Sequence, residues 1–172
     1  MRGVAMSLHD RMGVSRSTRR LRLLLADDHE SVRQGLRLLF EERRNIDVVR
    51  DVADGESAVE AARTLKPDVV VMDLSMGGMS GLAAARVIKL DLPDTAIVVL
   101  TRHSEHAYVQ EVLTTGASGY VLKQSPFDEL LRGVTAAASG IRYIDRAITP
   151  LDTAEQPASF RANTPAQQVN AR

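Results

Sequence analysis

The stretch Asp68-Val69-Val70-Val71-Met72-Asp73 decides the fold. Four consecutive apolar residues without polar alternation are typical of a strand that is buried on both faces of a parallel sheet. Leu21–Ala26, Ala96–Leu100 and Tyr120–Leu122 have the same character. Ile46–Val52 is more polar and is therefore predicted to be an edge strand. The chain thus contains five predicted strands, most of them strongly apolar.

Apolar residues at helical spacing follow each predicted strand. After the first strand, Val32, Leu36, Leu39 and Phe40 recur on one face of a predicted helix. The other stripes are Ala58, Val59, Ala62 and Leu65; residues 82–90; Val109, Val112 and Leu113; and Phe127, Leu130, Leu131 and Val134. Strands that alternate with amphipathic helices predict an α/β fold, a (βα)5 arrangement in which helices cover both faces of a parallel sheet.

The composition restricts the class of protein. At 172 residues the chain is long enough for one domain with a sizeable core. It has no cysteine, which excludes a disulfide framework and a thiolate metal site, and fits a reducing, cytoplasmic location. No apolar run is long enough to cross a membrane, so no membrane partner is expected. Residues 21–149 carry 15 basic and 19 acidic side chains, which argues against direct nucleic-acid binding by this domain.

The two ends of the chain differ from its centre. Residues 1–20 contain five arginines, one aspartate and no apolar period, so we expect a disordered basic leader there. The folded domain is predicted over residues 21–145. Residues 146–172 contain three prolines and few large apolar side chains, which indicates a linker or disordered tail.

Polar side chains stand at the carboxyl ends of four predicted strands. Asp27 and Asp28 follow the first strand, Asp73 ends the third, Thr101 follows the fourth and Lys123 follows the fifth. In an open parallel α/β sheet these ends line the crevice where ligands bind. The pattern therefore predicts one pocket that contains three carboxylates, a hydroxyl and an ammonium group.

Such a pocket suits phosphoryl transfer. The Asp73 carboxylate could attack phosphorus and form an aspartyl phosphate. Neighbouring carboxylates are ligands that Mg²⁺ prefers, and the cation offsets charge on phosphoryl oxygens. Lys123 would neutralise another phosphoryl oxygen, and the Thr101 hydroxyl would donate a hydrogen bond to a third. Each residue alone also suits a helix cap, a turn or a solvated surface, and only their agreement across four strands favours the pocket.

The histidines are not expected to bind metal. His29 follows the aspartate pair, but a solvated histidine in the first turn of a helix is the favoured interpretation. His103 and His106 lie three residues apart without an evident third ligand, which argues against a zinc site.

The sequence resembles the response-regulator receiver family of two-component signalling over about residues 21–145. Four motifs carry the resemblance: Leu23-Leu-Leu-Ala-Asp27-Asp28-His29, Val69-Val-Val-Met-Asp73-Leu-Ser-Met76, Val98-Val-Leu-Thr101, and Gly119-Tyr-Val-Leu-Lys123-Gln-Ser-Pro126. The resemblance implies a flavodoxin-like, doubly wound sheet of strand order 2-1-3-4-5. It also implies a signalling protein rather than an enzyme.

The resemblance further implies a role for each matching residue. A sensor histidine kinase would phosphorylate Asp73. Asp28 and Asp73 would bind Mg²⁺ directly, Asp27 would bind it through water, and the Ser75 carbonyl would be a further ligand. Lys123 would contact the phosphoryl group. Thr101 and Tyr120 would be the switch pair, in which Thr101 moves toward the phosphate and Tyr120 follows it inward, repacking a surface that pairs two receivers as a homodimer.

The stretch from Ala117 to Lys123 is similar to the NarL/FixJ-like subclass, whose members have LuxR-type helix-turn-helix outputs. In that subclass a linker leads to the DNA-binding domain, often near a Thr-Pro pair. Here Thr164-Pro165 is followed by seven residues, so we expect no helix-turn-helix in this chain. DNA would be contacted, to regulate transcription, only through an output domain that is missing from it, whether the chain is truncated or a stand-alone receiver.

Two positions depart from the family pattern. Gly77 replaces the proline of a Met-Pro-Gly run, which loosens the loop after Asp73, and Arg102 replaces a small residue after the switch threonine. These departures bear on the rates of phosphorylation and hydrolysis. They also leave open a phosphorylation-independent module for dimerisation or partner binding. An enzyme on the same fold, such as a phosphatase or a flavin or cobalamin protein, is a third and less favoured interpretation, because Val32 occupies the glycine position of the cobalamin motif.

Overall fold

The protein is seen in a computed structural model that describes residues 19–148. Strands and helices alternate along these residues, as the hydrophobic pattern predicts. The strands are β1 (Leu21–Ala26), β2 (Ile46–Val52), β3 (Val69–Asp73), β4 (Ala96–Thr101), β5 (Gly119–Leu122) and β6 (Tyr143–Ile144). The helices are α1 (Glu30–Glu41), α2 (Gly55–Leu65), α3 (Gly81–Asp91), α4 (His106–Thr114) and α5 (Phe127–Ala138).

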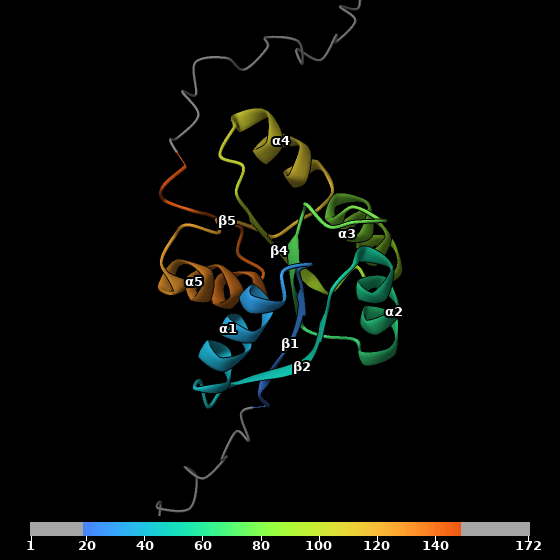
Figure 1. Ribbon diagram of the computed structural model, residues 1–172, viewed down its shortest axis with the longest axis vertical. Coiled ribbons are helices and arrows are strands. Elements are labelled where there is room, and N and C mark those ends of the chain that lie inside the picture. The colour runs from blue at the N-terminus through green and yellow to red at the C-terminus, as the bar shows by residue number, and fades with distance from the viewer. Residues whose placement is uncertain (1–18, 149–172) are drawn as a thin grey trace, which may run out of the picture.

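All strands pair in parallel, in the order β2-β1-β3-β4-β5-β6 (Figure 1). The flavodoxin-like order 2-1-3-4-5 is therefore confirmed, and the polar strand β2 lies at an edge as predicted. The two-residue strand β6 was not predicted, because so short a stretch has no period. It forms the edge of the sheet opposite β2, where Tyr143 pairs with Gly119 and Ile144 pairs with Tyr120.

Helices cover both faces of the sheet, and each face has its own core. In Figure 1, α1 and α5 lie on one side of the sheet, and α2 and α3 lie on the other. Because side chains alternate along a strand, Leu23 and Leu25 of β1 enter the α1/α5 core while Leu24 enters the core beneath α2 and α3. Phe40 of α1 meets Phe127 of α5 edge to face, with ring centroids 4.9 Å apart.

A glycine brings α3 directly against the end of β3. A Cβ atom at Gly81 would lie 1.8 Å from the carbonyl oxygen of Asp73, so only glycine allows this approach. The Gly81 amide donates to the Leu74 carbonyl at 3.2 Å, and Ser80 caps the helix by accepting from the Ala83 amide. The backbone on both sides of Asp73 is therefore held by the helix that follows it.

The packed body extends to Ile148, beyond the predicted boundary at residue 145. Ile148 is buried in the core that also contains Tyr120, and its amide donates to the carbonyl of Asp145. These contacts place residues 146–148 in the folded body, although their composition suggested linker. Residues 19 and 20 of the predicted leader are described, and there Arg19 forms an ion pair with Asp68 and Arg20 lies 3.8 Å from Asp47. The rest of the predicted leader and of the predicted linker lies outside the described residues. Within residues 19–148, no helix is long and apolar enough to span a membrane.

Candidate functional site

The predicted pocket lies at the carboxyl ends of β1, β3, β4 and β5. Asp27 and Asp28 follow β1, and Asp73 is the last residue of β3. Thr101 is the last residue of β4, and Lys123 follows β5. Parallel pairing brings these ends to one edge of the sheet, because β1 pairs with β3, β3 with β4 and β4 with β5.

Lys123 lies between two buried carboxylates. Its Nζ atom is 2.7 Å from Asp73 Oδ2 and 2.7 Å from Asp27 Oδ2. The exposed fractions of the side chains are 12% for Lys123, 4% for Asp27 and 2% for Asp73, so water screens these contacts weakly. The Lys123 amide donates to the Thr101 carbonyl at 2.7 Å, which holds the backbone of Lys123 against β4.

One oxygen of Asp27 has no hydrogen-bond donor. Lys123 donates a hydrogen bond to Asp73 Oδ2, but its approach to Asp27 Oδ2 lacks the geometry of one, and that buried oxygen has no other partner in the described part of the chain. Its other oxygen accepts from the His29 amide at 2.9 Å. The charge of Asp27 Oδ2 is therefore compensated by the Lys123 ammonium alone, without a hydrogen bond.

Asp28 is partly exposed and is held by His29. His29 Nδ1 lies 2.6 Å from Asp28 Oδ1 and 3.3 Å from Asp27 Oδ1. The histidine is half-exposed at the start of α1, as expected for a first-turn residue, but its ring contacts the acidic side chains and does not simply face solvent. Its role in orienting Asp28 was not predicted.

The donor atoms fit a magnesium ion. One ligand atom from each of Asp27, Asp28, His29 and Asp73 lies within 4.8 Å of the others. Three carboxylates and one ammonium leave an excess of two negative formal charges. Like charges no more than 4.8 Å apart repel by at least roughly 3 kcal/mol at an effective dielectric constant of about 20, so a hard divalent cation would relieve the crowding.

The two predicted switch residues are both buried. Thr101 Oγ1 accepts from the His103 amide at 3.2 Å, which leaves the hydroxyl hydrogen available for donation. The Tyr120 hydroxyl donates to the His103 carbonyl at 2.8 Å. Burial raises the pKa of Tyr120 to about 12. Both predicted switch residues therefore bond to the backbone of His103, in the loop that leads to α4.

Helix α2 supports the loop after Asp73. Glu56 Oε1 accepts from the Met79 amide at 2.9 Å, and the same carboxylate would lie 3.2 Å from a Cβ atom at Gly78, whose φ is +72°. Gly77 has open space around it, and the Ser75 amide donates to Asp73 Oδ1 at 3.2 Å. The Glu56 contact partly restrains a loop that lacks the expected proline.

Sequence reasoning missed the contacts that Glu56 and Asp145 make here, and it did not predict the contact of His29 with Asp28. Glu56 offered only an ordinary first-turn position as a signal, His29 is the N-cap of α1, and Asp145 follows a stretch too short to recognise as a strand. The predicted Ser75 is exposed in the loop beside Asp73, and the Arg102 side chain is exposed next to Thr101. The predicted residues Asp27, Asp28, Asp73, Thr101 and Lys123 meet at one edge of the sheet. Tyr120 is linked to them through His103, whose carbonyl accepts a hydrogen bond from the tyrosine hydroxyl.

An acidic pocket with a buried lysine, at the carboxyl edge of a flavodoxin-like sheet, points to the class of signalling receiver domains. Residues 23–135 match the response regulator receiver domain family. The chain therefore belongs to the response regulator receiver family of two-component systems.

Individual relatives agree with this assignment. The chain is 37% identical over 130 residues to the transcriptional regulatory protein DegU of Brevibacillus brevis, which covers 76% of this chain and 55% of DegU. It is 38% identical over 130 residues to the oxygen regulatory protein NreC of Staphylococcus haemolyticus, covering 75% of this chain and 60% of NreC. The chain thus spans little more than half the length of these curated relatives. Their names describe a transcriptional regulatory protein and an oxygen regulatory protein. The chain is thus a receiver domain of a response regulator related to the NarL and DegU transcription regulators.

Two solved structures share the fold of this chain. The crystal structure of a LuxR-family two-component response regulator from Aurantimonas sp. SI85-9A1 superimposes with a TM-score of 0.72 at 37% identity, covering 75% of this chain and 92% of that one. The receiver domain of RcsB from Salmonella enterica serovar Typhimurium, solved with the phosphomimetic BeF3-, gives a TM-score of 0.70 at 28% identity and covers 75% and 96% of the two chains.

Proposed function

We propose that this receiver accepts a phosphoryl group on Asp73 from a sensor histidine kinase. The observation that carries the proposal is the position of Lys123, whose Nζ atom contacts Asp73 and Asp27 at 2.7 Å in a buried acidic pocket. An unphosphorylated pocket of this kind has a nucleophilic carboxylate held beside a fixed cation. These are the groups that a phosphoryl acceptor needs.

The transfer step uses the Asp73 carboxylate as nucleophile. One of its oxygens forms the new P–O bond while the P–N bond of the phosphohistidine donor breaks and the leaving imidazole takes a proton. Lys123 then neutralises charge on the phosphoryl oxygens, since its ammonium group already contacts Oδ2 of the acceptor. The free hydroxyl hydrogen of Thr101 donates to another phosphoryl oxygen.

Asp27, Asp28 and Asp73, with the Ser75 carbonyl, would hold Mg²⁺. When bound, the ion offsets negative charge on the transferring phosphoryl group. The cluster of three carboxylates supports this assignment, because carboxylate oxygens are ligands that Mg²⁺ prefers. His29 lies beside these proposed ligands, with Nδ1 at 2.6 Å from Asp28 Oδ1 and at 3.3 Å from Asp27 Oδ1.

The phosphorylated state would act through the β4–β5 side of the domain. Thr101 and Tyr120 both bond to the backbone of His103, one to its amide and one to its carbonyl. A phosphoryl group that draws Thr101 away would change the loop that leads to α4, and the population of the two packings would shift. The output would be dimerisation or partner contact, and then regulation of transcription through a DNA-binding domain outside this chain.

Intact mass after incubation with Mg²⁺ and a small phosphodonor tests the acceptor. Wild type should gain one phosphoryl group, and Asp73→Asn should gain none. The matched control is Asp94→Asn at an exposed turn, which should gain the group at the wild-type rate. Uptake by Asp73→Asn at the wild-type rate would exclude Asp73 as the acceptor.

One observation favours a second candidate, a phosphorylation-independent partner module. Gly77 has open space around it and Arg102 is exposed next to Thr101, so both departures from the family pattern lie beside the pocket. In that case wild type and Asp73→Asn would have the same oligomeric state with and without the phosphodonor. Sedimentation analysis of both proteins separates the candidates, because a switch requires a change in wild type alone.

A further inference from the structure

The residues that follow α5 form a compact attachment to β5. We call Tyr143–Ile148 the C-terminal clasp. In Figure 1 this orange-red end of the described chain runs beside β5. The Tyr143 amide donates to the Ser118 carbonyl at 2.9 Å, and β6 pairs with β5 through only two residues. At the end of the clasp, Ile148 is buried in the core that contains Tyr120.

Asp145 is the centre of this clasp, and its exposed fraction is 1%. Its Oδ2 atom accepts from the Leu122 amide at 2.9 Å, and its Oδ1 atom accepts from the Ala147 amide at 2.8 Å. Its own amide donates to the Tyr120 carbonyl at 2.8 Å. Within residues 19–148 no basic side chain forms an ion pair with Asp145, so backbone amides alone compensate its burial.

Asp145 binds the amide of Leu122, the last residue of β5 before Lys123. The β5–β6 ladder ends at Tyr120, and beyond it the Asp145 carboxylate takes the place of a strand partner. On the opposite side of β5, the Lys123 amide donates to the Thr101 carbonyl at 2.7 Å. The end of β5 is therefore held from both sides immediately before the lysine reaches Asp27 and Asp73.

We propose that Asp145 is a positioning residue for Lys123, and that the clasp transmits the state of the pocket to the chain beyond Ile148. This inference rests on the proposed phosphoacceptor function. The same carboxylate joins the strand that carries Tyr120 and Lys123 to the residues that lead out of the domain. A rearrangement of β5 therefore moves the clasp, and a change in the clasp moves Lys123.

Asp145→Asn tests the positioning role with little change in shape. The amide side chain keeps one acceptor oxygen, so it satisfies Leu122 or Ala147 but not both. We expect phosphoryl uptake at saturating phosphodonor to fall about tenfold or more, because small misplacements of a reacting group are costly. The Mg²⁺ dissociation constant should stay within about twofold, since every ligand is intact. Asp94→Asn, an exposed aspartate, should match wild type in both measurements.

Hydrogen exchange at single amides tests the transmission. Beryllofluoride with Mg²⁺ is the phosphoryl mimic, and wild type should change its exchange rate at Ala147 and Ile148 by more than threefold. Asp145→Asn should lose this response. Ile148→Ala leaves all Asp145 bonds in place, so it should take up phosphate at the wild-type rate and lose the response at residues 147 and 148.

The outcomes separate the two proposals. Wild-type uptake by Asp145→Asn overturns the positioning role, and a wild-type exchange response in Ile148→Ala overturns the transmission, even if Asp145→Asn fails to fold. A wild-type protein that takes up no phosphate and binds no beryllofluoride contradicts the proposed function itself. In that event Lys123 has no phosphoryl group to contact, and the inference falls with the proposed function.

Discussion

Replacing Lys123 by methionine should lower Tm, raise the affinity for Mg²⁺ and slow phosphoryl uptake. The substitution keeps the aliphatic stem and removes the ammonium group, which lies 2.7 Å from one oxygen each of Asp27 and Asp73. Removing one partner of a buried ion pair costs about 3–5 kcal/mol. For a domain of this size we therefore expect Tm, measured without Mg²⁺, to fall by roughly 10 °C.

Magnesium affinity should rise in the same variant. Lys123 occupies an oxygen of two proposed ligands and adds positive charge beside the cation. Unit charges about 4 Å apart interact by about 4 kcal/mol at an effective dielectric constant of 20. A change of about 1.4 kcal/mol, a third of that energy, already changes a dissociation constant tenfold. Lys123→Met should therefore bind Mg²⁺ at least about tenfold more tightly. Phosphoryl uptake should fall about a hundredfold, because a preorganised cation is lost from the transferring group.

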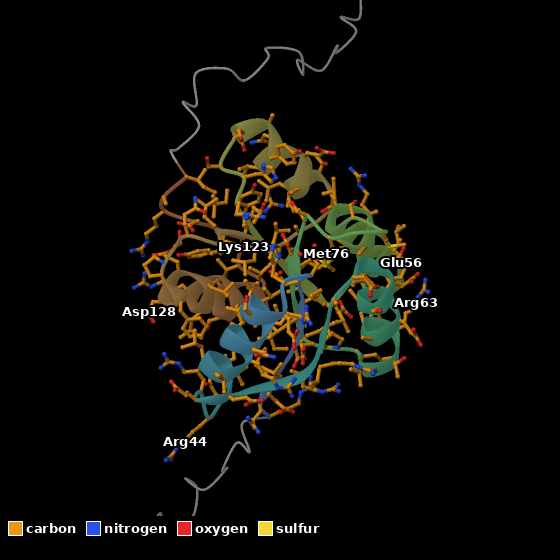
Figure 2. The ribbon with its side chains drawn as sticks, in the orientation of Figure 1. Arg44, Glu56, Arg63, Met76, Lys123 and Asp128 are labelled. Atoms are coloured by element: carbon orange, nitrogen blue, oxygen red, sulfur yellow. The ribbon has the colours of Figure 1, made fainter. Side chains whose placement is uncertain are left out.

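Titration calorimetry, thermal unfolding with and without Mg²⁺, and the time course of intact mass measure these three effects. Arg44→Ala removes a cationic side chain that extends away from the body (Figure 2) and should leave all three values near wild type. Unchanged or weaker Mg²⁺ binding in Lys123→Met would refute the reasoning, since the lysine would then not compete with the cation. An unchanged Tm would show that the two short contacts contribute little to stability.

Three further predictions concern the backbone near the pocket and the switch residue. Gly78→Ala should lower the free energy of unfolding by about 1–2 kcal/mol in urea titrations, because φ is +72° there, whereas Gly77→Ala in open space should change it by less than about 0.5 kcal/mol. Gly81→Ala should lower the urea midpoint and slow phosphoryl uptake, because its Cβ would lie 1.8 Å from the Asp73 carbonyl; normal values for both would contradict the close packing. Burial raises the pKa of Tyr120 from 10.0 to about 12, so its stabilising contribution is complete below pH 10 and is lost as pH rises toward 12. Unfolding measured against Tyr120→Phe should therefore show the two proteins diverging only in that alkaline window, and parallel curves would contradict this prediction.

Most of the pocket was predictable because its residues obey a local rule. Asp73 and Thr101 each end an apolar strand, and Lys123 follows one, so hydrophobic pattern alone located them at one edge of the sheet. Strand order came from the family resemblance, since apolar runs do not specify which strand lies beside which. The roles assigned to Ser75 and to the kinase remain predictions that depend on the same resemblance.

The supporting contacts were not predictable because they join distant segments. Glu56 reaches the loop after Asp73 across 23 residues, and Asp145 reaches Leu122 across the same separation. Each is an ordinary acidic residue in its own neighbourhood, and only the tertiary fold brings it to a free backbone amide. No period or motif marks such a residue, whereas a strand end is marked by the strand that precedes it.

The position of the Tyr120 side chain depends on the packing around β4 and β5. This position bears on how a switch could work here. Its hydroxyl and Thr101 Oγ1 bond to the same residue, His103, so neither can move far without changing the loop before α4. A phosphoryl group that drew Thr101 away would therefore change the stability of this packing, and a modest free-energy difference is enough to shift the population. The Asp145 amide holds the Tyr120 carbonyl on the opposite side of that strand, so the clasp would be the element that sets this balance.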